Sequence, residues 1–147
     1  MYALDGKVAL VTGAGRHRGL GEAMAKRLAA DGARVVITDI GEEKGAQFAA
    51  EHIGTTAEMD AIADEINAAG GTATAHICDV TEEDQVASAV KTAVATYGRL
   101  DIMINNAGIG YLMTDILNLE QKDWDAVLNV NLRGVFFGIK HGAEQMI

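Results

Sequence analysis

The chain has 147 residues, of which 49% are hydrophobic and 22% are charged. This composition is typical of one globular domain and not of a disordered chain. The formal net charge of −9 argues against nucleic acid as a partner, because phosphate binding needs a basic surface.

Cysteine and histidine usage narrows the class further. The single cysteine, Cys78, cannot form a disulfide within the chain, which suits a reducing compartment. The histidines are His17, His52, His76 and His141. They share no metal-ligand spacing, so we expect no metal site. No apolar run approaches the roughly 20 residues that span a bilayer, and Met1 lies too close to the first expected strand for a signal peptide. We therefore expect a cytoplasmic protein without a membrane partner.

The first elements alternate between strand and helix. Residues 7–12 are mostly apolar and predict a strand buried on both faces. A helix follows and ends at Gly32, and its apolar stripe has the spacing i, i+4, i+8 at Leu20, Met24 and Leu28. Residues 34–39 (RVVITD) predict a second buried strand.

The connection over residues 41–54 is longer than the few residues usual at this point. Residues 42–52 are compatible with a small added helix, and a solvated surface insertion is the simpler alternative. Thr55 and Glu58 then form a capping-box pattern. The predicted helix ends at Gly70 and Gly71, and its apolar residues are Met59, Ile62, Ala63 and Ile66.

The remaining elements repeat the alternation. Residues 72–78 predict a third strand, and Thr81–Asp84 are expected to cap a helix. The apolar face of that helix is Val86, Ala89, Val90, Ala93, Val94 and Tyr97. Residues 100–105 predict a fourth strand, and a long helix runs from Asn118 to the chain end. Its apolar residues are Trp124, Leu128, Leu132, Val135, Phe136 and Ile139.

Strands that alternate with helices of this length predict βαβ units, a parallel sheet and right-handed crossovers. No repeat, low-complexity tract or proline-rich linker interrupts residues 1–147. We therefore expect a single α/β domain.

The first strand runs directly into a glycine cluster that opens a helix, a pattern that suits a dinucleotide. Glycines let the backbone approach a pyrophosphate, and a helix N-terminus offers it free N–H groups and partial positive charge. The candidate cofactor-binding residues here are Thr12, Gly13, Gly15, Arg18, Gly19, Leu20 and Gly21. Asp39 and Ile40 follow the second strand, where a carboxylate can accept hydrogen bonds from the adenosine ribose.

Asp39 favours NAD over NADP, because a carboxylate would repel a 2′-phosphate. Arg16 and Arg18 lie in the glycine loop and favour NADP instead. The attraction between an exposed, flexible arginine and a 2′-phosphate is weaker than the repulsion by the carboxylate. NAD is therefore the expected cofactor, and NADP is the alternative.

Five motifs occur in order on the expected elements: Thr12-Gly13 with Gly19-Leu20-Gly21, Asp39, Asp79-Val80, Asn105-Asn106-Ala107-Gly108, and Asn129-Val130-Asn131-Leu132. Together they closely resemble the N-terminal part of the short-chain dehydrogenase/reductase family, classical type, over essentially the whole chain. The resemblance implies a Rossmann-like, doubly wound parallel sheet with strand order 3-2-1-4.

The resemblance also implies roles for the later motifs. Asp79 and Val80 would contact adenine, although Asp79 could instead cap the next helix. Asn106, Ala107 and Gly108 would approach the cofactor ribose, while Asn105 would brace the central strands.

The glycine loop departs from the family pattern. Five residues, instead of the usual three, separate Gly13 from Gly19. The spacing from Gly15 to Gly19 and Gly21 restores the usual glycine pattern. We therefore expect a loop two residues longer that still holds a pyrophosphate.

Asn131 is the candidate catalytic residue. It falls in an i, i+4 row with Val127, Val135 and Ile139, which would place an amide on a buried helix face. An unpartnered buried amide costs about 1–3 kcal/mol, so a carbonyl or a water should bind it. By resemblance, its backbone carbonyl holds a water of the proton relay; a satisfied core asparagine is the alternative.

The serine and the Tyr-x-x-x-Lys pair that the family uses for catalysis are not found here, since Tyr2, Tyr97 and Tyr111 lack a lysine four residues later. We expect the chain to be the N-terminal part of a longer NAD(H)-dependent oxidoreductase, truncated at its C-terminus. That enzyme would act on a small alcohol or ketone as a homodimer or homotetramer. The alternative is a non-catalytic dinucleotide-binding module. Residues 111–113 could supply an apolar wall for the substrate.

Overall fold

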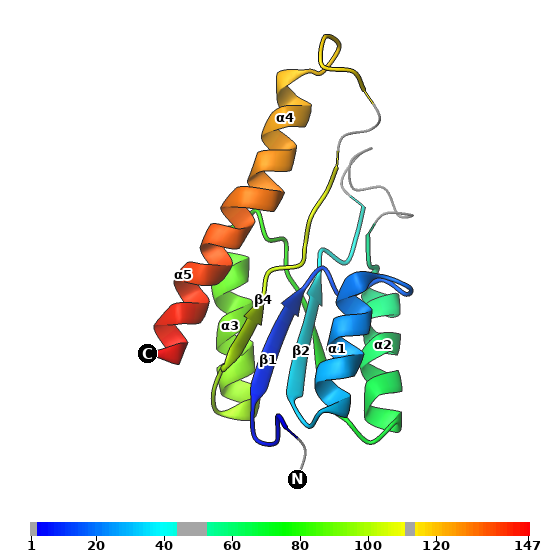
Figure 1. Cartoon of the computed structure of the whole chain (residues 1–147), viewed down its shortest axis with the longest axis vertical. Coiled ribbons are helices and arrows are strands. Elements are labelled where there is room, and N and C mark those ends of the chain that lie inside the picture. Colours follow the sequence, from blue (N-terminus) through cyan, green and yellow to red (C-terminus); the bar gives the residue numbers. More distant parts are fainter. Residues whose placement is uncertain (1–2, 44–52, 111–113) are drawn as a thin grey trace.

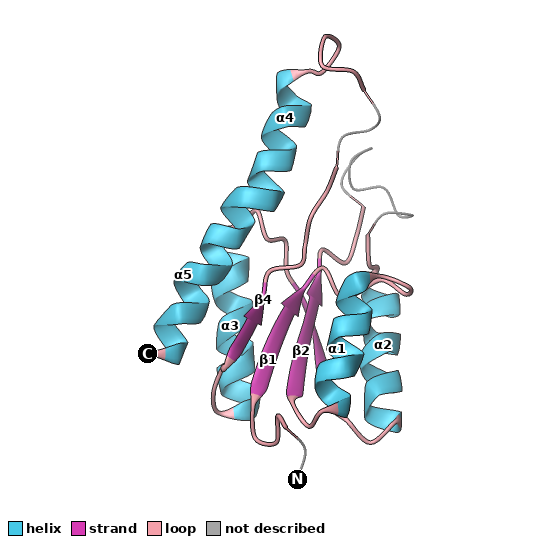
Figure 2. Cartoon of the chain, viewed as in Figure 1, coloured by secondary structure: helices cyan, strands magenta, loops and turns pink. Residues whose placement is uncertain are grey.

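A four-stranded parallel sheet forms the centre of the fold (Figures 1 and 2). The computed structural model describes residues 3–43, 53–110 and 114–147. The strands are β1 Val8–Thr12, β2 Arg34–Asp39, β3 Thr72–Ile77 and β4 Ile102–Ile104. Their order is β3-β2-β1-β4, which confirms the predicted doubly wound topology. β4 is shorter than predicted, because Asn106 N donates to Ile104 O and turns the chain out of the sheet.

Helices cover both faces of the sheet. The α-helices are α1 Leu20–Ala30, α2 Thr56–Ala68, α3 Glu83–Tyr97, α4 Gln121–Leu128 and α5 Val135–Met146. A π-helical segment, Asn129–Gly134, joins α4 to α5. α1 and α2 lie on one face of the sheet, and α3 and α5 lie on the other (Figure 1). Of the helix considered for residues 42–52, only 42 and 43 are described, and residues 111–113 also lie outside the described part.

Alternate residues of β1 separate the two cores. Ala9 and Val11 point to the core under α1 and α2, whereas Val8 and Leu10 point to the core under α3. All four are fully buried, as expected for a central strand of a parallel sheet with both faces covered.

The buried face of α1 differs from the prediction. Leu20 is 79% exposed, and the buried residues of α1 are Gly21, Glu22, Ala25 and Ala29. Small side chains let the helix lie close to the sheet. Of the predicted stripe, Leu28 packs against this core as a partly buried residue, whereas Leu20 does not. Apolar periodicity alone does not reveal this choice, because alanine and glycine carry little hydrophobic signal.

The long C-terminal helix shows the same kind of difference. It begins at Gln121 rather than Asn118. On the face that packs against the rest of the chain, a glycine follows Val130 at every fourth position. These buried glycines are Gly134, Gly138 and Gly142. Asn131, predicted on a buried face, is exposed. The predicted apolar residues Leu132 and Phe136 are 64% and 57% exposed.

α4 extends beyond the carboxyl ends of the strands (Figure 1), and β4 is one of the two edge strands of the sheet, with β3 at the other edge. Within the described part of the chain, no helix has the length and apolarity needed to cross a membrane.

Asp101 joins the start of β1 to the segment before β4. Its carboxylate accepts hydrogen bonds from Val8 N at 2.9 Å, Lys7 Nζ at 3.2 Å and Arg99 Nη2 at 2.6 Å. Burial opposes ionisation, but these donors outweigh it and lower the pKa of Asp101 to about 2. The stabilisation is therefore complete above the unfolded-state pKa of about 3.9 and disappears as the pH falls toward 2.

Asp101→Asn should lower the melting temperature at pH 7, because the charge-assisted bonds are lost. Between about pH 4 and pH 2 the wild type should lose stability more steeply than the variant, so the two curves converge. Thermal unfolding across this pH range tests the prediction, with Asp60→Asn on the exposed side of α2 as the control. Parallel curves for wild type and Asp101→Asn would contradict it.

Gly138→Ala should destabilise the chain by about 1–3 kcal/mol. A Cβ at Gly138 would overlap the side-chain oxygen of Asn105 and lie 2.9 Å from Met103 Cε. Gly142→Ala is the matched control, because its Cβ would come no closer than 3.3 Å to the flexible Met103 side chain, and alanine favours the helix. Urea unfolding of both variants measures the difference. Equal stability of the two would show that α5 does not depend on this close approach.

Candidate functional site

A cavity of about 260 Å³ opens at the carboxyl ends of the strands. This edge of an open α/β sheet is where such folds bind ligands, and the volume is near the lower end of small-molecule sites. Most predicted cofactor residues line it: Gly13, Gly19, Asp39, Ile40, Asp79, Val80, Asn106, Ala107 and Gly108. The site therefore gathers residues from all four loops that follow the strands.

Other predicted residues lie beside the cavity rather than on its wall, namely Thr12, Gly15, Arg18, Leu20 and Gly21. The glycines among them serve close packing. A Cβ at Gly21 would overlap the Gly13 carbonyl and lie 2.7 Å from Asn106 Nδ2. Gly13 itself has φ +63°, and a Cβ there would lie 2.7 Å from Ala107 Cα. These glycines bring α1, β1 and the segment after β4 into backbone contact.

Thr12 and Asn106 join the ends of β1 and β4. Thr12 Oγ1 accepts hydrogen bonds from the amides of Asn106 and Ala107, both at 3.1 Å. Asn106 Nδ2 donates to the carbonyls of Thr12 and Gly13, both at 2.9 Å. The brace between these strands is therefore the side chain of Asn106. The prediction that Asn105 braces the central strands is wrong, because the Asn105 side chain lies against Gly138 of α5.

Asp39 joins β2 to the glycine loop. Its carboxylate accepts hydrogen bonds from Gly15 N at 3.0 Å and Ile40 N at 2.9 Å. Burial and the negative charge of Glu58 raise the pKa of Asp39, while amide donors, including Gly54 N, oppose the shift. A carboxylate has about four lone-pair positions, so Asp39 keeps acceptor capacity toward the cavity.

Asp79 closes the turn into α3. Its Oδ1 accepts from Thr81 N at 2.9 Å and Thr81 Oγ1 at 2.7 Å. The residue at the helix N-cap is Glu82, which makes no capping hydrogen bond through its side chain. The prediction that Thr81 caps α3 is wrong, and so is the alternative that Asp79 caps it, because these bonds of Asp79 Oδ1 go to Thr81, ahead of the N-cap.

Asn131 holds the segment after β4 against the C-terminal helix. Its Oδ1 accepts from Ile109 N at 2.9 Å, and its Nδ2 donates to Ile109 O at 2.8 Å. The expected partner for the amide is thus a backbone group, although Asn131 is exposed rather than buried. It lies in the π-helical segment, and such segments are frequent at functional sites because their i→i+5 pattern displaces backbone groups.

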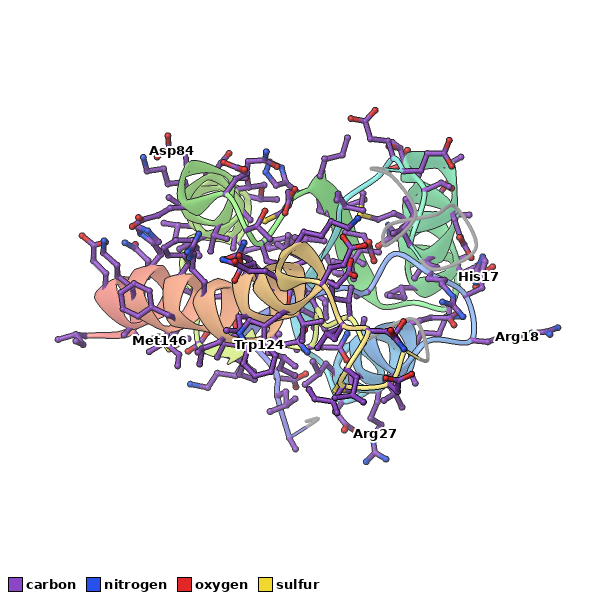
Figure 3. All side chains as sticks on the ribbon, turned by 90° about the horizontal axis from the view of Figure 1, so that it is seen from above. His17, Arg18, Arg27, Asp84, Trp124 and Met146 are labelled. Atoms are coloured by element: carbon purple, nitrogen blue, oxygen red, sulfur yellow. The ribbon has the colours of Figure 1, made fainter. Side chains whose placement is uncertain are left out.

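The two arginines of the glycine loop face different ways. Arg16 lines the cavity. Arg18 points out into solvent from the rim of the molecule (Figure 3) and has φ +61°, the one positive value among the described non-glycine residues. Of the two arginines, Arg16 is therefore the one that belongs to the cavity wall.

An acidic group beside the loop already has a cation. Ligand atoms of His17, Glu22 and Glu65 lie within 4.8 Å of one another. Lys26 Nζ lies 2.7 Å from Glu22 Oε1 and 2.8 Å from Glu65 Oε2. Burial opposes ionisation of Glu22, but bonds from Lys26, His17 and Arg18 lower its pKa to about 2. The ammonium of Lys26 thus fills the place of a metal ion.

The cavity wall also contains residues that sequence reasoning did not select, namely Ile53, Cys78, Ile109 and Val130. Extending the Asp79-Val80 motif and the motif at residues 105–108 by one position would have found Cys78 and Ile109, and Val130 lies within the last motif without having been selected. Ile53 lies within the long connection, near its end, and no pattern in the sequence indicates it.

Comparisons with known proteins agree with this geometry. The family model described as short chain dehydrogenase matches residues 7–147. A mitochondrial borneol dehydrogenase from Lavandula x intermedia is 45% identical over 145 residues, which are 98% of this chain and 48% of that protein. The chain therefore spans about half the length of this curated relative.

Solved structures of similar fold were determined with either cofactor. Carveol dehydrogenase from Mycobacterium avium, in complex with NAD, has a TM-score of 0.89 and 30% identity, over 99% of this chain and 51% of that one. A metagenomic short-chain oxidoreductase in complex with NADP has a TM-score of 0.79 and 36% identity, over 97% and 57%. The chain belongs to the short chain dehydrogenase family.

Proposed function

We propose that the protein is an NAD(H)-dependent oxidoreductase that interconverts a secondary alcohol and a ketone. The observation that best supports this function is the cavity at the carboxyl edge of the sheet, where Asp39 lies next to the glycine loop. The nicotinamide of the cofactor would supply the hydride exchange. The residues of this chain would seat the dinucleotide.

The residues present fit a dinucleotide. Asp39 retains acceptor positions for ribose hydroxyls, and Asp79 and Val80 line the cavity where adenine would lie. α1 begins at Leu20 after Gly19, which caps it without a side-chain hydrogen bond. Its first amides therefore have no side-chain cap and can serve an anion.

The balance of charge favours NAD. Asp39 is largely buried, so its repulsion of a 2′-phosphate is screened less than at an exposed site. Arg16 lines the same cavity and acts in the opposite direction. Among the similar structures, one is in complex with NAD and one with NADP.

The serine and the tyrosine–lysine pair would come from sequence beyond these 147 residues. The chain covers about half of its curated relatives, which supports an enzyme over a non-catalytic module. The backbone carbonyl of Asn131, displaced in the π-helical segment, would hold a water of the relay. An in-frame serine and Tyr-x-x-x-Lys after Ile147 in the coding sequence would favour the enzyme, and an immediate stop codon would favour the module.

We also propose that the protein works as a homodimer or homotetramer in the cytoplasm. The support for assembly is the exposed apolar face of the C-terminal helix, which includes Leu132, Phe136 and Ile139. The support for the compartment is the single cysteine.

The cofactor proposal predicts that the intact protein binds NADH more tightly than NADPH in a nicotinamide-fluorescence titration. Asp39→Asn should weaken NADH about tenfold, because a charge-assisted bond to the ribose is lost, and should weaken NADPH much less. An equal loss for both cofactors would mean that Asp39 only supports the loop. Tighter wild-type binding of NADPH would contradict the choice of NAD, and binding of neither cofactor would overturn the proposed function.

The assembly proposal predicts that the isolated 147-residue chain self-associates, because its exposed apolar face and the open edge of β4 remain uncovered. Leu132→Glu combined with Phe136→Glu should shift the chain toward monomer in sedimentation velocity. Gln145→Glu, an exposed polar position on α5, controls for added charge. A monodisperse wild-type monomer with a cooperative melt would contradict the prediction.

A further inference from the structure

Three backbone amides of the lengthened glycine loop donate to carboxylates from three different elements. The pairs are Gly15 N with Asp39 Oδ2 at 3.0 Å, His17 N with Glu58 Oε1 at 2.7 Å, and Arg18 N with Glu22 Oε2 at 2.5 Å. The acceptors belong to β2, α2 and α1 respectively. These amides are consequently not free to bind a phosphate, although the loop lies where a diphosphate is expected.

Glu58 makes the most distant of these bonds. It occupies the last position of the predicted capping box, and its own amide donates to Thr55 Oγ1 at 3.2 Å. In a complete capping box the glutamate would turn back to the Thr55 amide. Here the carboxylate accepts from the amide of His17, which is 41 residues away in the sequence.

This use of Glu58 has an electrostatic cost. The negative charge of Glu58 acts on Asp39 and raises the pKa of that carboxyl. Glu22 is paired with Lys26, but Asp39 and Glu58 approach the same loop, where a further anion, the cofactor, is expected. A cation is needed to offset them, and Arg16 is the arginine of the loop that lines the cavity.

The hydrogen bonds on either side of Arg16 hold the backbone of this residue in place. Gly15 is held by Asp39 before it, and His17 is held by Glu58 after it. The bond from Arg18 N to the buried Glu22 stabilises the left-handed conformation of Arg18, whose side chain then points into solvent (Figure 3). The carboxylates therefore hold the loop backbone on both sides of the arginine that lines the cavity.

We propose that Glu58 is a positioning residue of the cofactor site. By holding the amide of His17, it keeps the lengthened loop in the conformation that turns Arg16 toward the diphosphate of the dinucleotide. Arg16 thereby replaces the contacts of the amides that the carboxylates occupy. This inference rests on the proposed function, since it needs a dinucleotide in the cavity.

The test compares Glu58→Ala, Glu58→Gln and Glu65→Ala in the intact protein. Glu65 is the matched control: it is a glutamate on the same helix and meets His17 only through the ring, with its Oε1 3.9 Å from Nε2. Affinities for NADH, ADP and adenosine are measured by titration calorimetry or ligand-observed NMR. ADP carries the diphosphate and adenosine does not.

Glu58→Ala should weaken NADH and ADP about tenfold, the usual effect of losing a charge-assisted hydrogen bond, and leave adenosine unchanged. Glu58→Gln should restore most of the affinity, because an amide oxygen still accepts from His17 N. Glu65→Ala should bind all three ligands as the wild type does. A loss that is equal for ADP and adenosine, or no loss at all, would overturn the inference.

A double-mutant cycle with Arg16→Ala tests the mechanism directly. Arg16→Ala should weaken NADH and NADPH equally, since both carry the diphosphate, and Glu58→Ala should add little in its background. Additive losses, or a loss confined to NADPH, would overturn the inference. If Glu58→Ala fails to fold, the same cycle is run with Glu58→Asp, whose side chain is one methylene shorter and loses the reach to His17 N. Failure of the wild type to bind NADH and ADP would instead overturn the proposed function.

Discussion

The hydrogen bonds between the ends of β1 and β4 set the geometry on which the cavity depends. Thr12 and Asn106 satisfy each other's backbone groups, so the two strands separate at a fixed point and leave space above their ends. Asp39 adds the end of β2 to this assembly through the amide of Gly15. Ligand-facing groups are therefore positioned by the tips of three strands, which are rigid, rather than by the loops alone.

The order of elements and the sheet topology could be predicted from the sequence, because buried strands and helix spacing are local patterns. The buried faces of α1 and α5 could not. Both helices lie against the protein through small residues such as Ala25 and Gly138, whereas Leu20 and Phe136 are exposed. Hydrophobic periodicity detects large apolar side chains, whereas a helix packs closely on a sheet through small ones.

The candidate site divides in the same way. Its location follows from the glycine loop and the strand ends, which neighbouring residues define. The roles of single side chains depend on groups distant in sequence: Asn106 bonds to Thr12, and Glu58 bonds to His17. The choice between Arg16 and Arg18 also depends on such bonds. A sequence motif contains neighbouring residues only and therefore does not reveal hydrogen bonds between distant ones.

The thiol of Cys78 lies in the cavity wall at the end of β3. Burial, with the negative charges of Asp79 and Asp39 nearby, raises its pKa to about 12. Because thiolate rather than thiol reacts with alkylating reagents, Cys78 stays unreactive while this part of the protein is folded. As the single cysteine of the chain, it is a built-in reporter, whose labelling rate measures how often this part of the protein opens.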